Sequence, residues 1–150
     1  MAYLKKILLL LIYLLINHSI ASKNDIKINE ISSGIFVFNG VNEEPNTNNQ
    51  GVIANISFII GDESILVYDA GPSKVFAKKF IKKIKKLTNT PIKYLVISHR
   101  HFDHSYGIEA FIEEGAKIYM DEKEFKYFIK EGPIINNILI KNRGLNKNNI

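Results

Sequence analysis

The sequence predicts an α/β protein in which β-hairpins are followed by helices and strands in the order α-β-α-β-α. Short runs of β-branched and aromatic residues come first, and an amphipathic segment and an apolar run typical of a buried strand follow them. The chain has 150 residues, of which 46% are hydrophobic and 23% charged, which is the balance of one globular domain with its own core. We find no internal repeat and no interdomain linker.

Residues 1–21 have the pattern of a signal peptide. Lys5 and Lys6 precede the ten apolar residues 7–16, and small residues stand at Ser19 and Ala21. Ten apolar residues are too few to span a bilayer, which takes about 20. We therefore expect cleavage after Ala21 and an exported domain, residues 22–150, that is periplasmic or secreted and not stably inserted in a membrane. An uncleaved N-terminal anchor is the alternative.

The strands are predicted from residue type and from turn signals. Residues 34–39 and 51–60 are rich in Ile, Val and Phe and are bounded by Gly and Asn. Gly61-Asp62-Glu63 separates the second run from residues 64–68, which indicates a hairpin. Further along the chain, we expect strands at residues 92–98 and 116–119.

Residues 74–87 are predicted to form an amphipathic helix with Ser73 as its N-cap. The apolar positions recur at helical spacing: Phe76, Phe80, Ile84 and Leu87. Lysines fill the opposite face, which could bind a membrane surface or RNA. We favour a solvated face over a helix that covers a sheet, because no aromatic residue interleaves with the lysines. The net charge of +5 therefore does not lead us to expect a nucleic-acid partner. Two further helices are expected at residues 105–114 and 121–130.

Three of the four histidines lie within the six residues His99-Arg100-His101-Phe102-Asp103-His104. Side chains alternate along a strand, so His99 and His101 at a strand end should point to the same side and converge on one metal ion. Asp103 and His104 follow where the chain turns toward the next helix. Nitrogen and oxygen donors in a chain without cysteine suit Zn²⁺, and also Fe or Mn. The alternative is a surface accident.

The His-x-His-x-Asp-His pattern of residues 99–104 resembles the metallo-β-lactamase superfamily. The segment SILVYDAG at 64–71 is similar to the strand of that family that ends in Asp-x-Gly. Residues 55–61 and 105–111 resemble its exported branch related to the quinoprotein-relay and sulfur-oxidation zinc hydrolases. The resemblance covers about residues 31–120 and implies the αββα fold, of which this chain would be the first αβ half.

The resemblance also implies roles for the individual residues. His99 and His101 would hold one zinc ion, and Asp103 and His104 a second. Asp103 would also orient or deprotonate the attacking water, a metal-bound hydroxide. Asp69 would be a carboxylate beneath the site, or only a turn-forming residue. The implied function is an exported zinc-dependent hydrolase that attacks an ester, thioester, lactam or similar bond in a small-molecule substrate.

The chain departs from the family pattern after the cluster. The family completes its two zinc sites with a third His, a bridging Asp and a final His, yet no histidine follows His104 here. We therefore expect the chain to be the N-terminal half of a longer enzyme and to be inactive by itself. A non-catalytic half-domain that binds a metal or a partner is the alternative.

Overall fold

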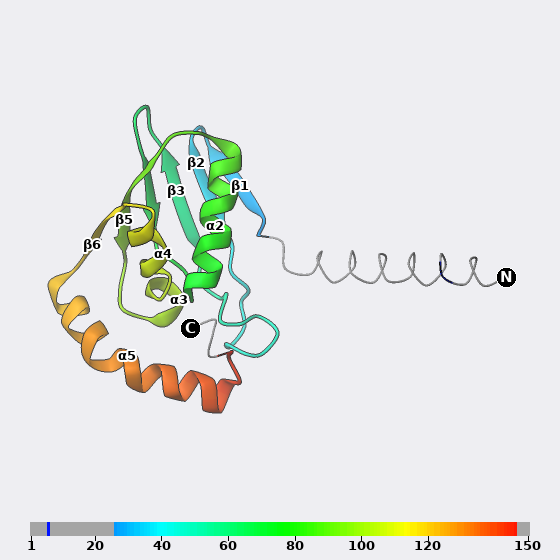
Figure 1. The fold of residues 1–150 in the computed structure, drawn as a ribbon, viewed down its shortest axis with the longest axis vertical. Coiled ribbons are helices and arrows are strands. Elements are labelled where there is room, and N and C mark those ends of the chain that lie inside the picture. The colour runs from blue at the N-terminus through cyan, green and yellow to red at the C-terminus, as the bar shows by residue number, and fades with distance from the viewer. Residues whose placement is uncertain (1–5, 7–25, 147–150) are drawn as a thin grey trace.

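The computed structural model describes residue 6 and residues 26–146, so the expected signal peptide lies outside the described residues. These residues form one six-stranded sheet with helices on one face and a long helix across one end (Figure 1). The elements in chain order are β1 (Ile28–Ser32), β2 (Ile35–Phe38), β3 (Ile56–Ile60), β4 (Ile65–Tyr68), α2 (Lys74–Leu87), β5 (Ile92–Ile97), α3 (Phe102–Ser105), α4 (Ile108–Glu113), β6 (Lys117–Met120) and α5 (Glu122–Arg143).

The strands follow one another across the sheet in sequence order. Strands β1 to β4 pair antiparallel: short turns join β1 to β2 and β3 to β4, and the loop at residues 39–55 joins β2 to β3. Strands β4, β5 and β6 are parallel because helices lie in the connections between them. The predicted α/β class is therefore confirmed, with β-hairpins first and α/β crossovers after them.

Helix α2 has the predicted bounds and the predicted N-cap. The Ser73 hydroxyl accepts a hydrogen bond from the Phe76 N–H at 3.1 Å. Phe80 and Ile84 are fully buried, and the Phe80 ring meets Phe58 of β3 edge to face at 5.9 Å. Leu87 shares the apolar spacing, but as the last residue of the helix it is 53% exposed.

The basic face of α2 is partly paired with acidic residues of helix α4. These ion pairs join Lys74 to Glu109 at 2.6 Å and to Glu113, Lys78 to Glu113 at 2.9 Å, and Lys85 to Glu114. Each surface pair stabilises the fold by only about 0–1 kcal/mol. These ion pairs nevertheless account for several of the lysines through contacts within the chain. The absence of a nucleic-acid partner stays a prediction.

The predicted helix at residues 105–114 corresponds to α4, which begins only at Ile108; α3 ends at Ser105, and Gly107 lies between the two helices. The Gly107 N–H donates to the Gly71 carbonyl at 2.9 Å, so this turn lies directly on the segment that follows β4. A Cβ at Gly107 would lie 2.1 Å from the Ala70 carbonyl oxygen. Only glycine permits this approach, and a helical pattern in the sequence does not reveal it.

Two other boundaries differ from the prediction. Strand β3 begins at Ile56 rather than at residue 51, since Gly51 has a left-handed backbone (φ +77°) and the Asn55 side chain accepts a hydrogen bond from the Gly40 N–H. Helix α5 continues well beyond Lys130 and ends at Arg143, where Gly144 is the C-cap with φ +64°. It contains Pro133, a residue that commonly marks a helix end.

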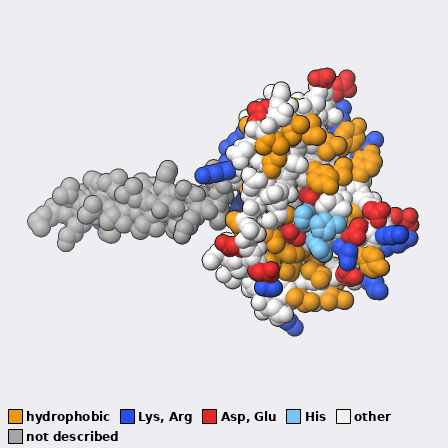
Figure 2. Space-filling view, turned by 180° about the vertical axis from the view of Figure 1, so that it is seen from behind, with side chains coloured by type: hydrophobic (Ala, Val, Ile, Leu, Met, Phe, Trp, Pro, Cys, Tyr) orange, Lys and Arg blue, Asp and Glu red, His pale blue; other side chains and the backbone are white. Residues whose placement is uncertain are grey.

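The face of the sheet opposite α2 also carries apolar side chains. Ile59, Tyr68 and Tyr119 lie on it and are about half exposed, between 44% and 51%. Figure 2 shows hydrophobic side chains grouped on this side of the molecule, with the histidine cluster beside them. One face of the sheet thus forms the buried core under α2 and α4, and the other is open beside the histidines.

We predict that Gly107→Ala destabilises the protein, because the new methyl group would meet the backbone of Ala70. Overpacking of this kind typically costs about 1–3 kcal/mol. Urea denaturation followed by circular dichroism would measure the loss. Ile112→Ala on the exposed side of α4 is the control and should change the free energy of unfolding by less than about 0.5 kcal/mol. Equal stability of Gly107→Ala and wild type would contradict the close packing of this turn.

Candidate metal centre

The histidine cluster lies on the loop after β5 and on the first turn of α3. His99 Nε2 lies 2.9 Å from His101 Nδ1, and the two ring centroids are 4.5 Å apart. The expected convergence of these imidazoles is present, but not for the expected reason. Strand β5 ends at Ile97, so strand alternation does not extend to His99 and His101. The bend of the loop brings their nitrogens together.

Asp103 and His104 form a second donor pair next to the first. His104 Nε2 lies 3.4 Å from Asp103 Oδ2, and the His104 ring is 4.2 Å from the His99 ring between centroids. The four predicted ligands are thus neighbours, arranged as two pairs. Among residues 26–146, no three His, Asp or Glu side chains are arranged to hold one ion together. Their role as metal ligands stays a prediction.

Asp69 lies beneath the cluster and is almost completely buried, with 2% of its surface exposed. Its carboxylate accepts hydrogen bonds from the Ser98 N–H at 2.8 Å and the Ser98 hydroxyl at 3.0 Å, and it contacts His104 Nδ1 at 2.8 Å. Its backbone is left-handed (φ +67°), as in a tight turn. Both sequence interpretations of Asp69 therefore describe real features: it forms the turn, and its carboxylate lies under the cluster.

These contacts indicate which ring nitrogen carries the proton in His104 and in His99. A carboxylate accepts hydrogen bonds, so His104 carries its proton on Nδ1 and leaves Nε2 facing Asp103. The Ser98 hydroxyl donates to Asp69 and accepts from His99 Nδ1 at 2.9 Å, so His99 leaves Nε2 facing His101. Protein imidazoles that bind metals are usually held in this way through the other nitrogen. The donor types and the outer hydrogen bonds therefore suit a metal ion, but no three donors among residues 26–146 are arranged to hold one.

The environment shifts the pKa values of two histidines in opposite directions. Burial lowers the pKa of His99, and the neighbouring imidazoles lower it further, which favours the neutral, metal-binding form. Burial also lowers the pKa of His104, but the hydrogen bond that His104 donates to Asp69 and the charges of Asp103 and Asp69 outweigh it, so the net shift is upward. Asp69 and Asp103 together therefore hold the pKa of His104 above its ordinary value.

Comparison with known proteins identifies the family. The sequence model of the Metallo-beta-lactamase superfamily matches residues 49–147. The chain belongs to this superfamily. It is 28% identical over 88 residues to the linear primary-alkylsulfatase of Pseudomonas sp. (strain ATCC 19151), which covers 55% of this chain and 17% of that protein. It is 24% identical over 88 residues to metallo-beta-lactamase IND-1 of Chryseobacterium indologenes, which covers 59% of this chain and 37% of that protein.

Solved structures of metallo-beta-lactamases share the fold. FIM-1 from Pseudomonas aeruginosa in its mono-zinc form matches with a TM-score of 0.60 at 16% sequence identity, over 73% of this chain and 47% of FIM-1. TMB-1 matches with a TM-score of 0.59 at 18% identity, over 73% of this chain and 49% of TMB-1. The expected partial metallo-beta-lactamase fold is confirmed. The chain spans less than half the length of each of these proteins.

Sequence reasoning missed an ionic cluster that surrounds the superfamily motif. Arg100, between the first two histidines, bonds to Glu124 at 3.2 Å and to Glu131 at 3.0 Å, and lies over the Tyr127 ring at 4.9 Å. All three partners come from one side of α5. Their helical spacing of three and four residues is visible in the sequence, but nothing in the sequence links them to Arg100.

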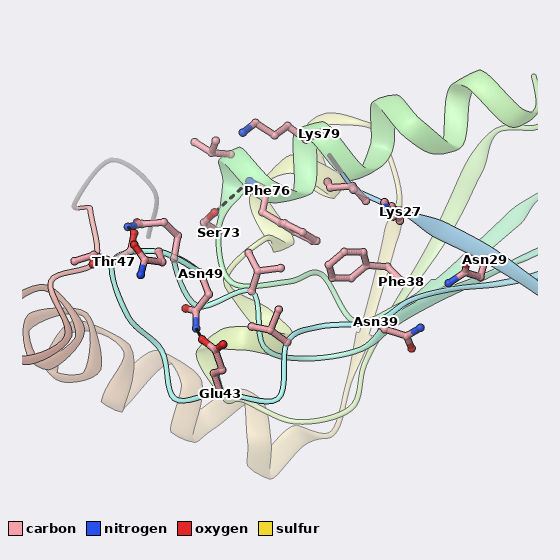
Figure 3. A pocket seen from close by; sticks show the side chains of 16 residues that line it. Lys27, Asn29, Phe38, Asn39, Glu43, Thr47, Asn49, Ser73, Phe76 and Lys79 are labelled. Atoms are coloured by element: carbon pink, nitrogen blue, oxygen red, sulfur yellow. Dashed lines mark hydrogen bonds between the residues drawn. The ribbon is translucent and has the colours of Figure 1, made fainter. Parts of the chain in front are cut away.

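A cavity of about 730 Å³ lies away from the histidines, between the start of α2, strands β1 and β2 and the loop at residues 41–52. Figure 3 shows the rings of Phe38 and Phe76 at its floor and the polar side chains of Asn49 and Lys79 at its edge. An apolar floor with a polar rim is typical of small-molecule pockets. None of the residues of the metal motif lines it, so we do not assign the superfamily chemistry to this cavity.

We predict that Asp69→Asn lowers the pKa of His104 in the metal-free protein. A raised His pKa stabilises the fold fully below the unfolded-state value of about 6.5, and this stabilisation is lost as the pH rises through the folded-state pKa. Asparagine tolerates the left-handed backbone but carries no charge. NMR titration of the His104 ring would measure the change, with Ser98→Ala as the control that keeps Asp69 in place. An unchanged His104 pKa in Asp69→Asn would contradict the assignment.

Proposed function

We propose that this chain supplies ligands to the metal centre of an exported, zinc-dependent hydrolase. One observation carries the proposal: His99 and His101 direct a nitrogen of each ring at one another across 2.9 Å, while Ser98 engages the other nitrogen of His99. Side chains prepared in this way are expected where a metal is bound, because the outer hydrogen bond fixes the tautomer and the ring orientation. The second pair, Asp103 and His104, has the same arrangement over Asp69.

Zinc is the metal that we propose, as one or two ions. Nitrogen and oxygen donors suit zinc, and also Fe or Mn. FIM-1, one of the structural neighbours, was solved in a mono-zinc form. His99 and His101 would hold one ion, and Asp103 and His104 would hold the second.

Hydrolysis is the reaction that we propose for the completed site. A bound zinc ion supplies Lewis acidity and lowers the pKa of water so that attack is possible near neutral pH. The Asp103 side chain is 15% exposed, so its carboxylate can reach a water molecule on the open side and orient it or accept its proton. Related proteins include an alkylsulfatase and a β-lactamase, so we propose only a small-molecule substrate with an ester, thioester, lactam or similar bond.

Export is part of the same proposal. The support is the sequence pattern of residues 1–21, with its basic start, its short apolar core and Ala21 at the expected cleavage position. In the described part of the chain, no helix is long and apolar enough to cross a membrane. We propose a periplasmic or secreted protein.

The alternative is a non-catalytic half-domain that binds a metal or a partner. It is favoured by the presence of only two donors in each pair among residues 26–146, since catalytic zinc has three protein ligands and a water. Metal binding without hydrolysis in a version extended to the length of the relatives would support this alternative. Hydrolysis by the extended version would support the enzyme.

We predict that His101→Ala lowers the zinc affinity of the chain on the order of tenfold or more, because it removes one donor of the first pair. In the extended version the same change should abolish hydrolysis. The His101 side chain is exposed, so the free energy of unfolding of the metal-free protein should change by less than about 0.5 kcal/mol. Zinc titration and an assay against a panel of esters and lactams would measure both effects. Lys86→Ala on the exposed side of α2 is the control, and full activity of His101→Ala would rule out His101 as a ligand.

We also predict that the mature protein begins at Ser22. N-terminal sequencing of the chain recovered from the periplasm or the medium would test this. Recovery of the chain with Met1 in the membrane fraction would show instead that residues 1–21 remain as an anchor.

A further inference from the structure

Arg100 lies between His99 and His101 in the sequence. Carboxylates of helix α5 bond to both the backbone and the side chain of Arg100. The Arg100 backbone N–H donates to Glu124 Oε2 at 2.9 Å. The guanidinium group bonds to both oxygens of Glu124 at 3.2 Å and to Glu131 at 3.0 Å. Among these contacts, the backbone bond acts on the peptide chain that carries His99 and His101.

We propose that Glu124 is a positioning residue for the metal pair formed by His99 and His101. The two rings project from residues on either side of Arg100, so rotation of the peptide that ends in the Arg100 N–H would move them relative to each other. Metal donors must be held to within about 0.5 Å of their productive positions. Strand β5 ends at Ile97 and therefore cannot supply this restraint. Glu124 supplies it instead, from a helix that follows the motif by about twenty residues.

The position of Glu124 is itself fixed by the start of α5. Asp121 is the N-cap of this helix, and its side chain accepts hydrogen bonds from the N–H groups of Lys123 and Glu124. Glu124 thus lies in the first helical turn, where a carboxylate also interacts favourably with the helix dipole. The side chain that holds the Arg100 peptide therefore comes from a rigid element.

A purely structural role would make Glu124 only one of several tethers for α5. The helix has an independent attachment, because the Tyr106 hydroxyl donates to the Gly132 carbonyl at 3.2 Å and the Tyr106 ring packs against Phe128. Glu131 also holds the guanidinium group without contacting the backbone of the motif. Loss of Glu124 and loss of Glu131 should therefore differ: only the first releases the peptide between the histidines.

This role of Glu124 rests on the proposed function, because it matters only if the two histidines bind a metal. The experiment tests the positioning and the metal binding separately. Glu124→Ala, Glu124→Gln and Glu131→Ala are made in the 150-residue chain. NMR of the metal-free protein measures the hydrogen exchange of the Arg100 amide and the nuclear Overhauser contact between the His99 and His101 rings. Zinc titration of the same samples measures affinity, and circular dichroism confirms that each variant is folded.

Glu124→Ala should raise the exchange rate of the Arg100 amide at least tenfold, remove the contact between the rings and weaken zinc binding by roughly 10–100-fold. Glu124→Gln keeps an oxygen that can accept from the Arg100 N–H and should restore zinc affinity to within about threefold of wild type. Glu131→Ala should also remain within about threefold, since it leaves the backbone bond in place.

Two results would overturn the inference. One is a Glu124→Ala variant that retains the ring contact, or that retains the zinc affinity of a zinc-binding wild type. The other is a Glu131→Ala variant with the same losses as Glu124→Ala, which would show that Glu124 only helps to attach α5. If the wild type binds no zinc, the proposed function fails, while the amide exchange and the ring contact still decide whether Glu124 positions the two histidines.

Discussion

The buried carboxylate of Asp69 is the interaction on which the rest of the site depends. It stands at the end of β4, accepts two hydrogen bonds from Ser98 at the end of β5, and holds the Nδ1 atom of His104 in α3. A buried charge is tolerated only when such partners are present, so three elements must come together for the fold to be stable. The left-handed turn that Asp69 begins continues through Gly71 at φ +82°. It presents the Ala70 N–H to the His104 carbonyl at 2.7 Å and the Gly71 carbonyl to Gly107. The same turn therefore supports both α3 and the histidine cluster.

A second acidic group acts on the loop from the outside. Asp69 holds the inner side of the cluster through Ser98, and Glu124 holds the Arg100 peptide from helix α5. The loop between β5 and α3 lies between these two carboxylates. His101 is exposed although it faces His99. At this site Asp69 and Gly107 support the turn, whereas the exposed His101 can be replaced at small cost to the fold.

The sequence predicts those features that local chemistry determines. The lysine and apolar spacing of residues 74–87 specifies α2 to the residue, and the four ligand-type side chains at 99–104 mark the candidate centre. Features that depend on contacts between distant segments were missed. Gly107 divides a helical pattern because the Ala70 backbone lies against it, and Pro133 lies inside α5 where the sequence indicates an end. His99 and His101 converge through a loop bend rather than through strand alternation. No local pattern could show that Glu124 reaches Arg100.

Asp69 and Ser98 determine which way the remaining ring nitrogens of His104 and His99 point. Asp69 and Ser98 occupy the Nδ1 atoms of His104 and His99, so the Nε2 atoms point away from the core. The histidines lie on the side of the molecule opposite α2, beside the open apolar face of the sheet (Figure 2). In the proposed metal site, a further ligand would reach each donor pair from that side. A zinc ion with two protein donors still needs a third to match a catalytic site. In the proposed metal site, the number of donors would therefore limit the affinity of each pair more than the orientation of those present, because Asp69 and Ser98 bond to the inner nitrogens and Glu124 bonds to the Arg100 peptide.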